Sequence, residues 1–182
     1  MANARETNKQ IQKGNELLKD ATIEVGFLDN AFKTLAASIT SAFEEVIDGM
    51  DGANTTAQKI AKSYERDIIG SIKASTKGLE DQINLQVKIN KGVNVEKEIN
   101  DKIAKVQARR QLTLEKINQE NGLSPKLKKE LEEKAKDIFA AEEASLKKLK
   151  ENNVQAQKNK SIFQLTGEAA GEIADKIDKS GT

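Results

Sequence analysis

Three pairs of adjacent glutamates are the side chains in this sequence that could most directly do chemistry. They are Glu44 with Glu45, Glu132 with Glu133, and Glu142 with Glu143. Two carboxyl groups that face one substrate can act as a general acid and a general base. Neighbouring residues on a helix, however, point about 100° apart, and lysines surround these pairs. The pattern therefore favours solvated helix faces over a catalytic dyad.

Two other stretches resemble binding sites only in part. The segment "DGMDGANTT" at 48–56 contains Asp48, Asp51 and two glycines, as a calcium-binding loop would. It lacks the alternating ligands and the closing glutamate of such a loop, so we interpret it as a turn between helices. The lysines of "KKLKENNVQAQKNK" could contact phosphates, but no aromatic residue is interleaved to stack on bases. This pattern argues against nucleic-acid binding.

Cysteine and histidine are both absent from the 182 residues. Their absence removes thiolate nucleophiles, imidazole bases and the usual zinc ligands. Charged residues make up 32% of the chain, yet the net charge is only +1, a balance typical of solvated helix faces. We therefore expect no enzyme, no cofactor and no metal site.

The chain is poor in the residues that build a thick core. Apolar residues make up 37%, below the usual ~45–50% of globular proteins, and aromatic residues only 3%. The N-terminus "MANARETNKQIQKGNELLKD" has no apolar signal-peptide region, and no run of ~18 apolar residues could span a bilayer. A cytoplasmic location is expected unless the chain belongs to a larger particle.

The single proline marks the clearest boundary in the sequence. Within "QENGLSPKLKKELEEKAKDIFAAEE", Asn121 and Gly122 predict a helix stop with the glycine left-handed, Ser124 an N-cap, and Pro125 the first helical turn. Apolar residues at helical spacing lie on both sides of this turn. The sequence therefore predicts an antiparallel helical hairpin over residues 93–160.

The stretch "TIEVGFLDNAFKTLAASITSAFEEVIDG" belongs to a longer seven-residue repeat in the predicted helix 1–48. The repeat and its companion position supply the residues that we predict to mediate self-association: Ile11, Leu18, Val25, Leu28, Phe32, Leu35, Ile39 and Val46. A sustained period of 3.5 indicates a left-handed coiled coil, and the wide apolar band favours three or more helices, hence a homo-oligomer. The alternative, that this helix packs on the rest of its own chain, is left open.

Two further segments complete the predicted organisation. Residues 49–92 form a second helical segment, with Asn54 or Thr55 as its N-cap and a stop at 90–92. Residues 161–182 form a short amphipathic segment that we expect to lead into a longer chain. The predicted fold class is therefore all-α: long amphipathic helices, with a coiled-coil segment followed by a long helical hairpin.

Small-residue apolar tracts such as "AFKTLAASITSAFEEVI" and "LTGEAAGEIADKI" alternate with charged coiled segments such as "LKKELEEKAKDIFAAEEASLKKLKENN". In this alternation the whole chain resembles the N-terminal part of a bacteriophage tail tape-measure protein. The resemblance implies a helical protein present in several copies in the lumen of the tail tube, in contact with other tail proteins and located in the virion. It carries no catalytic residues over to this chain.

Two other classes of protein fit the same sequence features. A coiled-coil scaffold or signalling module would share the heptads and the balanced charge. A membrane-acting amphipathic protein would place the region of Phe27, Phe32 and Phe43 against lipid, although tryptophan and a basic polar face are lacking. Membrane binding is therefore left open.

Overall fold

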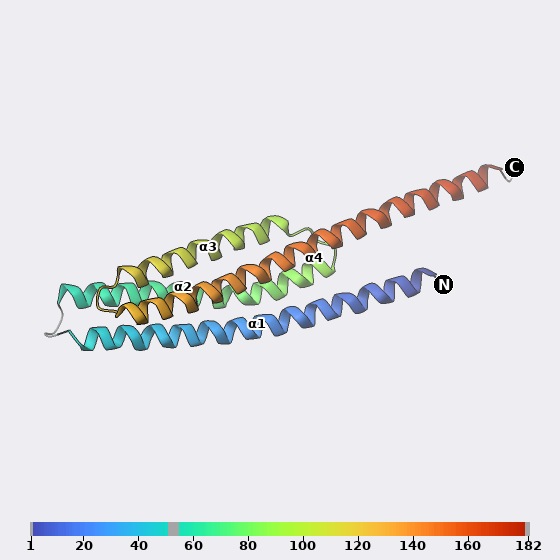
Figure 1. Ribbon diagram of the computed structural model, residues 1–182. Coiled ribbons are helices and arrows are strands. Elements are labelled where there is room, and N and C mark those ends of the chain that lie inside the picture. The colour runs from blue at the N-terminus through green and yellow to red at the C-terminus, as the bar shows by residue number, and fades with distance from the viewer. Residues whose placement is uncertain (1, 51–54, 181–182) are drawn as a thin grey trace.

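The described part of the chain folds into four long helices (Figure 1). They are α1 (Ala2–Asp48), α2 (Thr56–Asn90), α3 (Glu96–Gln119) and α4 (Pro125–Ser180). The structure is a computed structural model that describes residues 2–50 and 55–180, with side chains described in 8–50 and 55–160. It is 91% helical, and no strand occurs in the described residues. The predicted all-α class is therefore confirmed.

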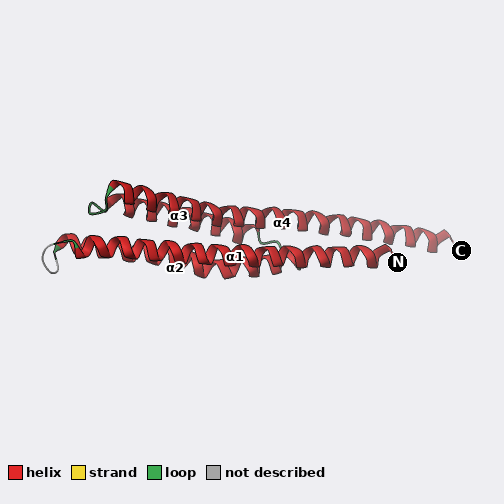
Figure 2. Ribbon diagram, turned by 60° about the horizontal axis from the view of Figure 1, so that its bottom comes forward, coloured by secondary structure: helices red, strands yellow, loops and turns green. Residues whose placement is uncertain are grey.

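The helices run alternately up and down the long axis, and Figure 2 shows them as two closely spaced pairs, α1 with α2 and α3 with α4. Helix α1 packs against α2 and α4, and α3 likewise packs against α2 and α4. Helices α2 and α4 also meet across the interior, whereas α1 and α3 make no contact within the described residues. The arrangement is that of an up-and-down four-helix bundle.

Each helix supplies one apolar stripe to a common core, as expected where few apolar residues are available. Leucine, isoleucine and phenylalanine dominate this core, and its largest fully buried side chains are Phe32, Phe43, Phe139, Leu28, Leu35, Ile39, Ile68, Ile72, Leu79, Ile99, Ile117 and Leu131. Phe32 of α1 meets Phe139 of α4 edge to face, with ring centroids 5.2 Å apart. Burial of aromatic rings in such pairs stabilises helix contacts strongly.

The structure corrects the role predicted for the α1 heptads. Leu28, Phe32, Leu35 and Ile39 are almost completely buried against the other helices of the same chain. They are therefore not available to copies of α1 in other molecules, and the alternative of packing on the same chain describes them.

The four other heptad residues lie nearer the surface. Leu18, Val25 and Val46 are half-buried at the edges of the core, and Ile11 is 57% exposed. Ile11 lies on a part of α1 that extends past the end of α2, since the Nδ2 of Asn90 donates to the carbonyl of Gly14 at 2.8 Å. Self-association through Ile11 stays a prediction.

Helix α4 also runs beyond its neighbours. Asn153 meets the start of α3, and the helix continues without a break through residue 160, where we had predicted a boundary, to Ser180 (Figure 1). The side chains of residues 161–182 lie outside the described residues.

A side-chain cap fixes the connection between α1 and α2, and a glycine follows α2. Thr55 and Gln58 form a reciprocal capping box at the start of α2, and the Nε2 of Gln58 donates to the carbonyls of Ile47 and Met50 at the end of α1. One side chain thus serves the two helix ends. After α2, Gly92 takes a left-handed φ of 73°, which glycine adopts without a steric penalty.

The connection between α3 and α4 spans residues 120–124. Ser124 accepts a hydrogen bond from the Leu127 backbone nitrogen at 3.3 Å, and Pro125 is the first residue of α4. Gly122 does not take the left-handed conformation that we predicted. A Cβ at this position would instead lie 2.3 Å from Cγ1 of Val46, so glycine is needed there because α1 approaches the turn closely.

We predict that Gly122→Ala lowers the free energy of unfolding by about 1–3 kcal/mol, because the added methyl group overlaps the stiff side chain of Val46. The double variant Gly122→Ala, Val46→Ala should lose less unfolding free energy than the sum of the losses in the two single variants. Urea unfolding of the four proteins in this cycle measures the coupling. Strict additivity would show that Gly122 is not constrained by Val46.

Candidate functional site

The interior of the bundle contains a charged cluster where α2, α3 and α4 meet. Glu142 of α4 is 2% exposed, and Ser75 of α2 is fully buried. Arg109 of α3 reaches in from the surface, and its Nη1 donates to the Ser75 Oγ at 2.9 Å and lies 3.8 Å from Glu142 Oε1. The second carboxylate oxygen, Oε2, is buried and has no hydrogen-bond partner.

Burial dominates the electrostatics of this cluster. Removal from water raises the pKa of the Glu142 carboxyl above its usual range, and the Ser75 hydroxyl and the positive charges of Arg109 and Lys102 oppose that rise. A carboxylate left partly unsatisfied in a core is costly. Any alignment of the helices that separates Arg109 from Glu142 would therefore lower the stability of the bundle.

Uncharged polar side chains extend this cluster along the interface between α2 and α4. The Oγ of Ser145 donates to Gln82 Oε1 at 2.8 Å. Gln86 accepts from the Asn152 Nδ2 at 2.9 Å and donates to Asn90 Oδ1 at 2.8 Å. Since Gln82 and Gln86 are buried, a shift of one helix along the other would leave their amides unpaired.

A last polar contact ties α4 to the beginning of α3. The buried Asn153 accepts from the Val95 backbone nitrogen at 3.1 Å through Oδ1 and donates to Asn94 Oδ1 at 3.0 Å through Nδ2. Asn94 in turn accepts from the backbone nitrogen of Glu96 at 3.1 Å. Two backbone N–H groups at the start of α3 are thus satisfied by side chains, one of them from α4.

Two small cavities adjoin this polar interior. A cavity of about 180 Å³ beside Glu142 is lined by Lys77, Lys105 and Arg109, and by Lys102, which pairs with Asp81 at 2.6 Å. A second cavity, of about 250 Å³, lies where α1 and α4 pass the end of α2. Its lining includes Lys13, Leu17, Asn90, Asn152 and Lys160. The first cavity is lined by carboxylates as well as by these basic side chains, whereas the lining of the second contains no acidic residue.

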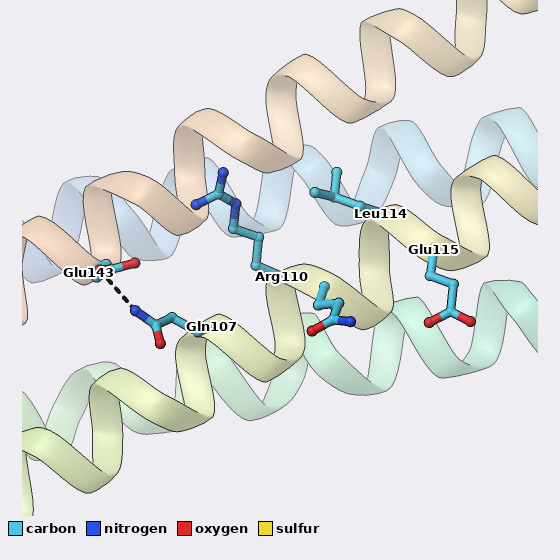
Figure 3. A pocket seen from close by; sticks show the side chains of 6 residues that line it. Gln107, Arg110, Leu114, Glu115 and Glu143 are labelled. Atoms are coloured by element: carbon cyan, nitrogen blue, oxygen red, sulfur yellow. Dashed lines mark hydrogen bonds between the residues drawn. The ribbon is translucent and has the colours of Figure 1, made fainter.

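An open groove of about 670 Å³ lies on α3 and α4 (Figure 3). In this view the Nε2 of Gln107 donates to Glu143 Oε1 at 3.1 Å, and Arg110, Leu114 and Glu115 lie along the same stretch of α3. Glu143 also pairs with Lys147 at 2.7 Å. These partners hold the pKa of the Glu143 carboxyl below its usual range, so it is not poised to accept a proton near neutral pH.

The three glutamate pairs are not all surface features. Glu44, Glu45 and Glu133 are exposed and Glu132 pairs with Lys136, as solvated faces would require. That interpretation is wrong for Glu142, which is buried. A signal was present in the sequence, because Glu142 stands between Phe139 and Leu146 at the spacing of the buried stripe.

The described residues contain no group of three or more acidic side chains able to hold a metal ion. Within the same residues, no helix combines the length and the apolarity that a membrane span requires.

Comparison with known proteins gives no relative. No protein-family model, no curated protein and no solved structure matches this chain.

We predict that the stability of the bundle responds to pH through Glu142. Because its pKa is raised in the folded state, its contribution to stability is greatest below the ordinary glutamate pKa and is lost as the pH rises through the folded value. The unfolding free energy of wild type relative to Glu142→Gln should therefore fall as the pH rises above the ordinary glutamate pKa. Urea unfolding at a series of pH values measures it.

Glu143→Gln is the matched control for this prediction. The pKa of the Glu143 carboxyl is lowered in the folded state, so its contribution to stability is present at neutral pH and is lost as the pH falls. The two variants should therefore differ from wild type with opposite pH dependence. The same trend in both would contradict the assignment of Glu142 as the buried, desolvated carboxyl.

Proposed function

We propose that this chain is a structural protein without catalytic activity, and that it forms a folded segment of a tape-measure-like phage tail protein. The observation that carries the proposal is the use of the buried polar groups. Gln82, Gln86 and Asn153 bond to other parts of the same bundle, where they fix the register of the helices. Such groups serve a rigid body better than a reaction centre.

The folded-back helices limit what this segment contributes to a ruler. A single helix of 182 residues would be about 273 Å long, whereas α4, the longest helix here, is about 84 Å long. In the proposal, the bundle therefore acts as a compact packing or anchoring body within the assembly, and other parts of the assembly set the length. Several copies would lie in the tail tube of the virion, in contact with other tail proteins.

A coiled-coil scaffold or signalling module is the second candidate. It is favoured by a specific observation: the core around Phe32 and Phe139 is closed by one chain, so the bundle can fold without a tail around it. A membrane-acting role has less support. Of the three phenylalanines that such a role would use, Phe32 and Phe43 are buried in the core. Phe27 alone is exposed and could contact lipid.

The proposal predicts that the chain is a component of purified phage particles. Quantitative mass spectrometry of the particles should find several copies per tail, with a tail-tube subunit as the internal standard. Antibodies against the chain should label tails only after mild denaturant has opened the tube, because the lumen is enclosed. Absence from particles, with the chain recovered in free form from the cell, would contradict the tail assignment and favour the scaffold.

A further inference from the structure

The outward face of α1 carries a second regular stripe, which is distinct from the buried one. It consists of Ile23, Phe27, Asn30, Thr34, Ala37 and Ser41, and we call it the outer seam. Its members are all exposed and are spaced alternately four and three residues apart over about 27 Å. With 3.6 residues per turn, this face lies opposite the buried side chains of Leu28, Phe32 and Ile39.

The outer seam is uncharged on a chain that is 32% charged. Phe27 is 72% exposed and Ile23 is 62% exposed, the two largest exposures among the large apolar side chains described. The hydroxyl of Thr34 donates to the carbonyl of Asn30 at 3.0 Å, so its polar group is already satisfied within the helix. Ile23 and Phe27 lie one helical turn apart, so together they expose a small apolar patch at one end of the outer seam.

We propose that the outer seam binds the outer seam of a second copy of this chain, in an antiparallel pair around a two-fold axis. Alternate spacing of four and three residues is that of a coiled-coil seam, whose side chains fit between those of another helix. With the axis between Asn30 and Thr34, Phe27 faces Ala37 of the second copy, and Ile23 faces its Ser41. Large side chains then meet small ones at both ends, which makes the seam complementary to itself, as a two-fold interface requires.

The charges beside the outer seam limit this pairing to a weak one. Asp20 and Glu44 continue its spacing, so Asp20 of one copy faces Glu44 of the other at each end, where both carboxylates stay in water and salt screens their repulsion. Lys33 flanks the centre, near Lys33 of the second copy. Its charge is offset by an ion pair with Asp29 of its own helix, with Nζ and Oδ2 2.6 Å apart.

The exposed face of α2 would suit self-pairing less well. It carries Lys59, Lys62, Arg66, Lys73 and Lys77, and no ion pair is found for them in the described residues. A two-fold contact through that face would bring like charges together.

Gly26 adds an observation from the edge of the outer seam. A Cβ there would meet no atom within 4 Å, so the bundle itself does not need a glycine at this exposed helical position. Glycine weakens a helix interior, and close approach of another backbone is one of the uses that offset this cost. A neighbouring helix seated on the outer seam supplies such an approach. Gly70, on the exposed face of α2, has equally open surroundings, so Gly26 is compatible with a contact and does not by itself select the outer seam.

This inference deepens the proposed multi-copy structural role, on which it rests, by naming where one copy meets another. A seam of six residues on one helix is smaller than a standard protein interface, so a weak, reversible dimer is expected. The two ideas can fail separately. Sedimentation tests the outer seam in the purified chain, and the particle composition tests the tail.

Sedimentation velocity over a hundredfold range of concentration should show a monomer–dimer equilibrium for the full chain. Phe27→Glu should weaken the dimer at least tenfold, with unchanged helix content and melting midpoint, because Phe27 is exposed in the monomer. Leu112→Glu, at a 37% exposed site on α3, is the matched control and should dimerise as wild type does. A wild-type chain that stays monomeric, or a Phe27→Glu chain that still dimerises, would overturn the proposal.

Cysteine cross-linking tests the orientation, since the chain has no cysteine of its own. A mixture of Ile23→Cys and Ser41→Cys chains should form a disulfide-linked heterodimer under mild oxidation. Ile23→Cys alone should cross-link poorly, because the two sites lie at opposite ends of an antiparallel pair. Efficient cross-linking of Ile23→Cys to itself would indicate parallel helices and would overturn the two-fold antiparallel seam.

Discussion

The fold depends on the contact between Phe32 and Phe139, which joins the first helix to the last. A chain with 37% apolar residues and 3% aromatic residues can bury only a narrow stripe on each helix. The four stripes form one core only if α1 packs against α4. The phenyl rings of Phe32 and Phe139, edge to face with centroids 5.2 Å apart, make that contact. Truncation of a phenylalanine in such a core typically costs about 3–5 kcal/mol, a large fraction of the stability of a domain.

The polar interior makes the apolar stripes specific. Leucine and isoleucine at regular spacing tolerate a slip of one turn, whereas the pairs Gln82 with Ser145 and Gln86 with Asn152 are satisfied in one register only. Glu142 and Arg109 strengthen this constraint, since their separation would leave a charge in the core. The stripes therefore supply the driving force for folding, and the polar pairs select the alignment.

The fold class could be predicted from the sequence because its causes are local. A single proline and continuous 3.6-residue stripes are sufficient for long helices. The partner of α1 could not be predicted in the same way, since a heptad shows that a helix packs on other helices and leaves their identity open. Leu35 and Ile39 have the same pattern whether a second copy or the same chain covers them.

Two positions show where local rules fail. Gly122 was assigned to a left-handed turn, but the close approach of Val46, distant in sequence, explains it. Glu142 was assigned to a solvated face because lysines lie near it in sequence, whereas tertiary packing removes it from water. In both cases the deciding neighbour belongs to another helix.

The central claim is that one chain buries its own heptad stripe. Isotope-filtered nuclear Overhauser spectroscopy tests it most directly, on a mixture of labelled and unlabelled chains that have been unfolded and refolded together. The account predicts strong contacts between the rings of Phe32 and Phe139 within labelled chains and no such contact from a labelled to an unlabelled chain. Contacts between these two rings that cross from one chain to another would show that α1 packs on a second copy, and would contradict the account.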